Sequence, residues 1–208
     1  DVSFTFIGPR GSGKKSLLGK LLFDCGGVPA REAERVKSLV RELGKPELFW
    51  YSQLASTRYR KSYSTRQVML QKDVSVTVAT TTQHNFNNNT LRNFHRTLAM
   101  CNEVVVVVSA QQPTQTSSSN DDWRSQLRRQ AVAVRALNKR VALVVVTHMD
   151  CVAWSTDAFN DTCATTMKIL ADAGIEGFAW TPAQHRDLPK AFRDRVRALL
   201  LCNNRQGA

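Results

Sequence analysis

The feature that most constrains the fold lies near the start of the chain, where residues 8–16 read Gly-Pro-Arg-Gly-Ser-Gly-Lys-Lys-Ser. This run follows a β-like segment at 2–7 and precedes a segment with leucines at 17, 18, 21 and 22. A strand, a turn with the spacing G-x-x-x-x-G-K and a helix together form the context of a phosphate-binding loop. Its glycines let backbone N–H groups face phosphate oxygens, and Lys14 reaches the terminal phosphates. An ordinary glycine-rich turn is the alternative interpretation.

One position of the loop departs from the motif. In the motif, the Lys is followed by Ser or Thr, whose hydroxyl ligates Mg²⁺. In this chain, the residue that follows is Lys15. Ser16 does not simply replace it, because one residue along a helix rotates the side chain by about 100°. We therefore predict no metal site, and expect Lys14 and Lys15 to neutralise any bound phosphates.

Strand-like and helix-like segments alternate after this loop. Continuous β-branched runs at 104–108 and 141–146 predict strands that are buried on both faces. A hairpin is predicted to turn near 71–73, whereas 45–65 is interpreted as loop-rich and 80–93 as a loop. Further elements are predicted as helices at 14–24, 29–43, 121–137, 156–172 and from 189, and as a short strand at 178–181. The chain is thus predicted to be one α/β domain with a mostly parallel sheet, helices on both faces and the ligand at the carboxyl ends of the strands.

The charge of the chain is its most unusual bulk property. The formal net charge of +12 suggests a polyanionic partner, with RNA favoured over a membrane because no basic amphipathic helix with bulky aromatic residues stands out. Solubility alone is the alternative explanation. Two helical stripes are candidates for RNA contact: Arg124, Arg128 and Arg135, extended by Lys139 and Arg140; and Arg186, Lys190, Arg193 and Arg197. Either stripe can equally be a solvated face.

Cysteine usage and the ends of the chain bear on location. The five cysteines include no C-x-x-C pair and are interpreted as small apolar residues of a reducing compartment. The apolar runs at 104–108 and 141–146 are too short to cross a bilayer. The chain begins with Asp1 rather than Met, so we expect it to be part of a longer protein. A cytoplasmic location is expected, with a mitochondrial one as the alternative if a targeting peptide was removed.

Several motifs resemble the G domain of translational GTPases in the elongation factor 1-alpha branch. Residues 6–8 and the loop match its first strand and turn, and residues 21–28 match the end of its first helix. Its Gln-Thr-Arg helix is matched by Gln126, Arg128, Val134, Arg135 and Leu137. Residues 149–154 with Phe159 are more similar to release-factor and Pelota-partner rescue GTPases. The resemblance covers nearly all of residues 1–208 and implies a P-loop NTPase G domain, followed in the family by β-barrel domains that this chain lacks.

This resemblance implies a guanine nucleotide, GTP or GDP, as the ligand. The implied contacts are Arg10, Gly11, Ser12, Gly13, Lys14, Lys15, Ser16, Thr147, His148, Asp150 and Gln184. Asp150 would accept hydrogen bonds from the guanine N–H groups, and His148 would stack in place of the family's Lys. Thr147 is too short to reproduce the contact of the family's Asn. The Ser of the last motif falls near Gln184.

The family's switch residues are largely replaced. The Mg²⁺-binding Thr falls on Tyr63, unless a register shift brings Ser62 or Ser64 there, and the Asp that supports the metal falls on Thr80. Gln83 replaces the Gly at the γ-phosphate. Only His84 remains, at the position that orients the attacking water, as either a catalytic residue or a vestige.

We therefore interpret the chain as a degenerate guanine-nucleotide-binding domain, a pseudo-GTPase whose hydrolysis is lost or very weak. Its expected role is that of a docking module in ribosome-linked translation, rescue or RNA surveillance, with RNA and a protein of that complex as partners. An active translational GTPase is one alternative. A structural RNA-binding ribosomal or ribosome-assembly component is the other.

Overall fold

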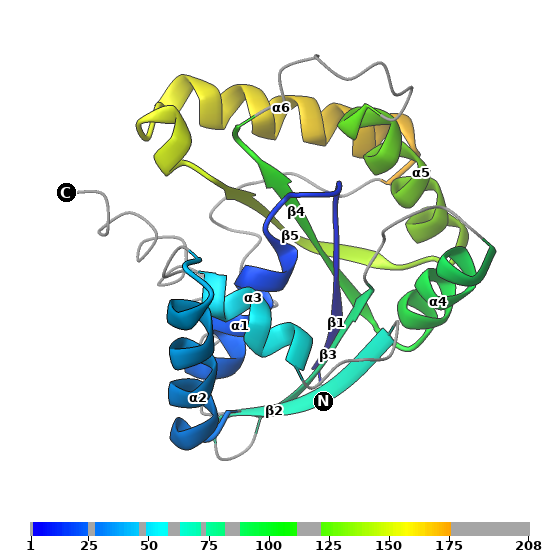
Figure 1. The fold of residues 1–208 in the computed structure, drawn as a ribbon. Coiled ribbons are helices and arrows are strands. Elements are labelled where there is room, and N and C mark those ends of the chain that lie inside the picture. Colours follow the sequence, from blue (N-terminus) through cyan, green and yellow to red (C-terminus); the bar gives the residue numbers. More distant parts are fainter. Residues whose placement is uncertain are drawn as a thin grey trace.

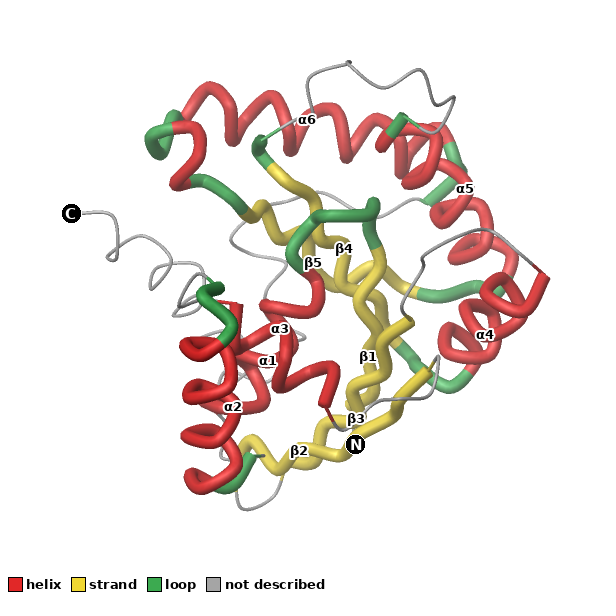
Figure 2. The backbone as a smooth tube through the Cα atoms, viewed as in Figure 1, coloured by secondary structure: helices red, strands yellow, loops and turns green. Residues whose placement is uncertain are grey.

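The computed structural model describes residues 2–24, 28–45, 49–57, 63–71, 74–81, 88–111 and 122–175. Its strands are β1 (Val2–Ile7), β2 (Tyr63–Gln71), β3 (Val74–Thr81), β4 (Glu103–Ser109) and β5 (Arg140–Thr147). Its helices are α1 (Lys14–Asp24), α2 (Ala30–Glu42), α3 (Phe49–Thr57), α4 (Asn88–Ala99), α5 (Trp123–Ala136) and α6 (Thr156–Asp172), and a short 3₁₀ turn covers Asp150–Val152. Figure 1 shows how these elements are arranged, and Figure 2 traces the same backbone by type of structure.

The described strands form one sheet in the order β2-β3-β1-β4-β5. β3, β1, β4 and β5 run parallel, and β2 pairs with β3 in the antiparallel direction. The mostly parallel sheet and the hairpin of β2 and β3 are therefore as predicted. The carboxyl ends of β1, β4 and β5 lie at one edge, where an open α/β sheet binds its ligands.

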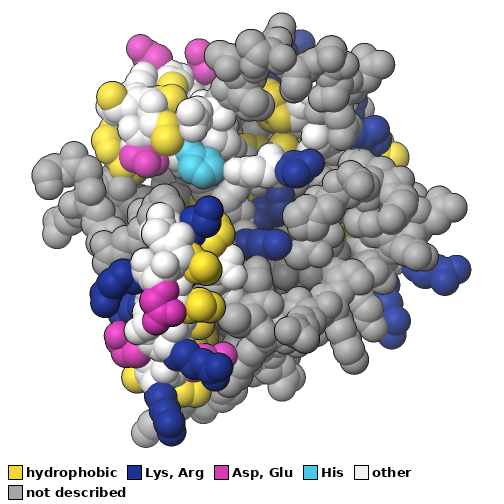
Figure 3. Space-filling model, in the orientation of Figure 1, with side chains coloured by type: hydrophobic (Ala, Val, Ile, Leu, Met, Phe, Trp, Pro, Cys, Tyr) yellow, Lys and Arg dark blue, Asp and Glu magenta, His cyan; other side chains and the backbone are white. Residues whose placement is uncertain are grey.

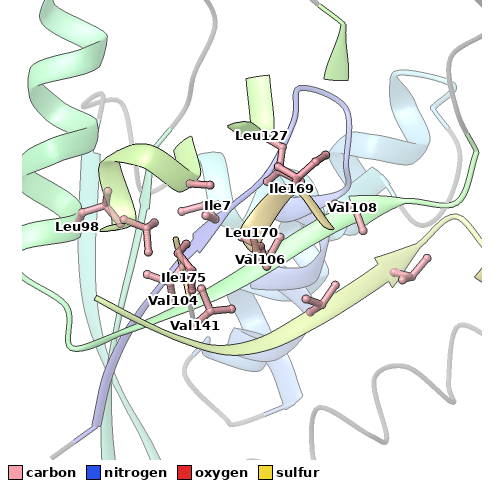
Figure 4. Packing of buried hydrophobic residues seen from close by; sticks show 14 of the residues in the cluster. Ile7, Leu98, Val104, Val106, Val108, Leu127, Val141, Ile169, Leu170 and Ile175 are labelled. Carbon is pink, nitrogen blue, oxygen red and sulfur yellow. The ribbon is translucent and has the colours of Figure 1, made fainter. Parts of the chain in front are cut away.

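Helices cover both faces of the sheet (Figure 1). Val105 and Val107 of β4 pack with residues of α1, α2 and α3, whereas Val104, Val106 and Val108 pack with residues of α4, α5 and α6. Figure 4 shows the second cluster, in which Leu127 of α5 and Leu170 of α6 lie over β4. The run of five valines is buried because each face of its strand meets helices, as the sequence predicted.

Helix α3 corrects the interpretation of 45–65 as loop-rich. Its backbone lies directly on α1, because a Cβ at Gly19 would be 1.8 Å from the carbonyl oxygen of Tyr51. Trp50 is buried and stacks on Tyr51, with 4.0 Å between ring centroids. The Lys37 ammonium of α2 lies 4.8 Å from the Trp50 ring. Trp50 and Tyr51 thus belong to a helical layer that packs on the sheet.

Some helix faces also differ from the prediction. Helical spacing predicts one apolar face formed by Val36, Leu39, Val40 and Leu43, but Leu39 and Leu43 are 44% and 59% exposed, because Ala33, Val36 and Val40 form the buried face of α2. Leu137 is 37% exposed and follows the last residue of α5. α4 begins at Asn88, so the end of the predicted loop 80–93 is helical.

The strand predicted at 178–181 and the helix predicted from residue 189 lie outside the described residues. Within the described part of the chain, no helix is both long and apolar enough to cross a membrane.

Candidate nucleotide-binding site

The phosphate loop, residues 8–16, joins β1 to α1 at the ligand edge of the sheet. Gly8, Gly11 and Gly13 have φ values of +142°, +79° and +76°, which favour glycine. A Cβ at Gly8 would also lie 1.9 Å from the carbonyl oxygen of Val107. The loop therefore needs its glycines for conformation and, at Gly8, for the close approach of β4.

The backbone N–H groups of the loop fall into two sets. Those of Gly8 and Arg10 donate to Gln130 Oε1 at 2.7 Å and to Gln126 Oε1 at 2.9 Å. The N–H of Ser12 donates to the Pro9 carbonyl at 3.3 Å. Among the described residues, no acceptor is bound by the N–H groups of Gly11, Gly13, Lys14, Lys15 and Ser16. These five N–H groups are available to an anion, whereas the predicted contribution from the N–H of Arg10 is already used within the protein.

Lys14 folds back over the loop that precedes it. Its ammonium donates to the carbonyl oxygens of Gly8 at 2.7 Å and of Pro9, and to Ser12 Oγ at 3.2 Å. Burial, and then the nearby Lys15 ammonium, lower the pKa of Lys14 from 10.5 to about 8. Lys14 and Lys15 thus place two adjacent basic side chains at the start of α1. In Figure 3, Lys and Arg side chains gather near the centre of this face, beside one His.

The residues at the metal position do not fit Mg²⁺. Lys15 is the second residue of α1 and brings a cation where Mg²⁺ needs an oxygen ligand. Thr80 pairs with Phe6 of β1, and Tyr63 pairs with Thr81, so the backbone places these two substituted positions at the same edge as the loop. Ser64, the neighbour considered in an alternative register, lies opposite Thr80.

Thr147, at the end of β5, contacts the phosphate loop. Its side chain is 9% exposed, and its hydroxyl lies 3.0 Å from the Ser12 carbonyl oxygen and 3.1 Å from that of Val108. The hydroxyl hydrogen is therefore used between β5, β4 and the loop. Thr147 therefore links β5 to β4 and to the phosphate loop, and its hydroxyl has no hydrogen left to donate to a nucleotide base.

The ring of His148 lies close to two hydroxyl groups. Its Nδ1 lies 2.8 Å from Ser109 Oγ and 3.4 Å from Thr147 Oγ1. Ser109 donates to the Gln111 carbonyl at 3.0 Å, and Thr147 donates to the carbonyls named above. With both hydroxyl hydrogens directed at carbonyl oxygens, Nδ1 is the ring nitrogen that we expect to carry the proton and to donate it to Ser109. In the neutral ring, Nε2 is then an acceptor.

Asp150 begins the 3₁₀ turn after this His, with an exposed side chain. Desolvation, followed by the charge of Asp150 and a hydrogen bond to it, raises the pKa of the Cys151 thiol. His148, Ala153 and Trp154 have φ values of +55°, +50° and +59°. Three non-glycine residues in the left-handed region make this a strained loop, as is common where a protein binds a ligand.

The predicted basic stripe on α5 divides into exposed arginines and two residues that are paired within the protein. Arg124, Arg128 and Arg135 are exposed. Lys139 instead donates to the Ala99 carbonyl at 3.2 Å, and Arg140 pairs with Glu103 at 3.7 Å. Two exposed arginines of α4, Arg92 and Arg96, had not been recognised as candidates. Neither α4 nor α5 contains an acidic residue.

Several predicted site residues lie outside the described part of the chain. They are Ser62, Gln83, His84, Gln184, Arg186, Lys190, Arg193 and Arg197. Other residues of the site had no predicted role in it. Ser109 positions His148, and Gln126 and Gln130 hold the loop. The available signal was that Gln130 lies three residues after Leu127 and four before Val134, on the inward face of α5.

Comparisons with solved structures identify the fold. The chain is similar to the S. cerevisiae Ski7 GTPase-like domain bound to GDP and inorganic phosphate, with a TM-score of 0.62 and 15% identity over 99% of this chain and 50% of that one. The GTP-bound Ski7 domain gives a TM-score of 0.60 with the same identity and coverage. Sup35 complexed with GMPPNP gives a TM-score of 0.50 and 20% identity over 85% of this chain and 34% of that one.

The chain thus has the fold of a P-loop GTPase G domain, and it resembles translational GTPases as predicted. It spans about half of the Ski7 structures and about a third of the Sup35 structure. No protein-family model matches the sequence, and no curated protein matches it significantly.

Proposed function

We propose that this domain binds a guanine nucleotide, GDP or GTP, without Mg²⁺ and serves as a docking module rather than an efficient GTPase. The observation that carries the proposal is the pair Lys14 and Lys15 beside five available N–H groups at the start of α1. Two ammonium groups and a helix N-terminus can neutralise a diphosphate with protein charge alone. The GDP and GTP bound to the Ski7 domain support the choice of nucleotide.

Weak hydrolysis follows from the same substitutions. Phosphoryl transfer relies on a metal ion to neutralise charge that develops on the phosphates. Lys15, Tyr63 and Thr80 take the three positions at which the family holds or supports that ion. His84 alone supplies no such charge, so we propose that it is a vestige.

Titration with GDP and GTP in EDTA and in millimolar Mg²⁺ tests this proposal. We expect nucleotide affinity that does not rise with Mg²⁺, and negligible GTP turnover with or without ribosomes. Lys15→Ser alone should not restore turnover. A strong requirement for Mg²⁺ would mean that the ligand assignment around residues 62–64 is wrong, and ribosome-stimulated multiple turnover would favour an active GTPase.

RNA is the partner that the charge supports best, within a ribosome-linked translation, rescue or surveillance complex in the cytoplasm. Arg92, Arg124, Arg128 and Arg135 are exposed on two helices that carry no acidic residue. Among the described residues, Arg92, Arg128 and Arg135 form no ion pair. The stripe predicted at Arg186, Lys190, Arg193 and Arg197 remains part of the proposal.

Replacing Arg124, Arg128 and Arg135 by Gln should weaken RNA binding and flatten its dependence on salt. Each lost phosphate contact should reduce the log–log slope by about 0.7–0.9. RNA binding with an unchanged slope would show that these arginines are only solvated. RNA binding by a protein that takes up no nucleotide would instead favour the structural RNA-binding alternative.

A further inference from the structure

Two glutamines of α5 hold the beginning of the phosphate loop. Gln130 is 1% exposed; its Oε1 accepts from the Gly8 N–H at 2.7 Å, and its Nε2 donates to the Gly8 carbonyl at 3.2 Å. One turn earlier, Gln126 Oε1 accepts from the Arg10 N–H at 2.9 Å. We call Gln126 and Gln130 the glutamine pair.

The spacing of the pair matches the spacing of the groups it binds. Residues four apart on a helix lie on the same side and are separated by a rise of about 6 Å. Gly8 and Arg10 are two residues apart, and two residues of extended chain advance by about 6.6 Å. Consecutive turns of α5 therefore reach alternate residues of the loop.

The chemistry at Gly8 suits an amide particularly well. A Gln side chain has one end that accepts and one that donates, so it satisfies both the N–H and the C=O of the same residue. Glu has no donor at neutral pH, so it would keep the Gly8 N–H paired but lose the bond to the Gly8 carbonyl. Leu has neither group, so it would leave the buried Gly8 N–H unpaired. The Gly8 carbonyl also accepts from Lys14, and β4 lies too close for any Cβ.

We infer that Gln126 and Gln130 are positioning residues of the nucleotide site, and this inference rests on the proposed function. They fix Gly8 and Arg10 in the conformation that leaves the N–H groups of Gly11, Gly13 and the first turn of α1 directed at the phosphates. Neither glutamine contacts the nucleotide. Their effect is to order the loop before the ligand arrives, which removes an ordering cost from binding.

The experiment compares GDP with guanosine, since only GDP has phosphates for the loop to bind. Both ligands are titrated in EDTA against the unaltered protein, Gln130→Leu and Gln126→Ala, with guanosine measured by competition. We expect Gln130→Leu to weaken GDP binding at least about tenfold, the scale of one lost buried hydrogen bond. Gln126→Ala should weaken it by about threefold, and guanosine affinity should stay within about twofold in both variants.

Val132→Ala is the matched control, because Val132 lies on the same helix with 57% exposure and away from the loop. It should leave the affinities for both ligands unchanged. If Gln130→Leu fails to fold, Gln126→Ala decides, because Gln126 is only partly buried.

Three results overturn the inference. GDP and guanosine affinities that fall in parallel show a general structural defect, and an unchanged GDP affinity in folded variants shows that the loop does not need the pair. In both cases the proposed function stands. No GDP binding by the unaltered protein overturns the proposed function itself, and the inference with it.

Discussion

The candidate site has a phosphate end, formed mainly by backbone groups, and a base end, formed mainly by side chains. At the phosphate end, the loop keeps its glycines and Lys14, and the recognition groups are backbone N–H groups. At the base end, Thr147 and His148 occupy the positions where the resemblance implies an Asn and a Lys, and Asp150 is the residue that matches. The hydroxyls of Ser109 and Thr147 are used inside the protein. Recognition by backbone depends on conformation, whereas recognition by side chains changes with each substitution. We therefore expect changes at the phosphate end to have the larger effects.

The largest effect is expected for Gly8→Ala. The new Cβ would lie 1.9 Å from the Val107 carbonyl oxygen, in a residue whose φ is +142°. Strain and overpacking together should lower the free energy of unfolding by about 3 kcal/mol or more. Urea unfolding measures this, with Gly11→Ala as the control, since no atom lies within 4 Å of a Cβ there. Equal losses in the two variants would contradict the close approach of β4.

Lys15→Ala should have the next largest effect, this time on binding. Removing one of two cations beside the phosphates should weaken GDP binding in EDTA by about 1–3 kcal/mol, the scale of a charge-assisted hydrogen bond. Guanosine should bind as before, because it reaches only the base end. Lys45→Ala is the control at an exposed position beyond α2. Tighter GDP binding by Lys15→Ala would contradict the role of Lys15 in charge neutralisation.

Affinity for GDP should also depend on pH. Lys14 loses its proton above pH 8 in the free domain, but phosphates favour its charged form, so binding above pH 8 takes up a proton. GDP affinity should therefore fall with rising pH, by up to about tenfold per pH unit between 8 and 10. Calorimetry in buffers of different ionisation enthalpy measures the uptake.

Two further results sharpen this prediction. Lys14→Met should abolish the slope. The stability of the nucleotide-free domain should change in the opposite direction, because the unfolded Lys14 keeps its proton up to its ordinary pKa of 10.5. Its free energy of unfolding should therefore rise between pH 8 and 10.5. Proton release on GDP binding would contradict the assignment of Lys14.

The smallest effect is expected at the base end, for Ser109→Ala. Without the Ser109 hydroxyl, the ring of His148 loses its 2.8 Å partner and its preference for a proton on Nδ1. Nitrogen-15 chemical shifts of the ring should report the Nδ1–H tautomer in the unaltered protein and a mixture in the variant. GDP affinity should change by less than about threefold, within one ordinary hydrogen bond. A proton on Nε2 in the unaltered protein would refute the assignment.

The sequence predicted best those features that are written in consecutive residues. The phosphate loop is a local motif, and the five valines of β4 are one uninterrupted run, so both were recognised and both hold in the structure. α3 was missed because its aromatic residues do not form a clear helical period. The glycine that receives α3, Gly19, lies 32 residues before Tyr51, too far for a local pattern to reveal it.

The polar contacts of the site were beyond sequence reasoning for a related reason. The glutamine pair binds residues 122 and 116 positions away, and Ser109 meets His148 across 39 positions. Such contacts depend on the register between β4, β5 and α5. The residue types were visible in the sequence, but their partners were defined only by the packing of the sheet.

The contact between Gly19 and α3 has a consequence for how this chain can evolve. Any side chain at position 19 would enter the backbone of α3, so no substitution there is neutral while the helix keeps its place. α1 begins in the phosphate loop, and a shift of α1 away from α3 would carry the loop with it. The same glycine that allows α1 to lie against α3 thus limits how far α3 and its aromatic residues can move. A protein that loses nucleotide binding is free of this limit only if it also loses α3, so we expect the loop and α3 to be kept or lost together.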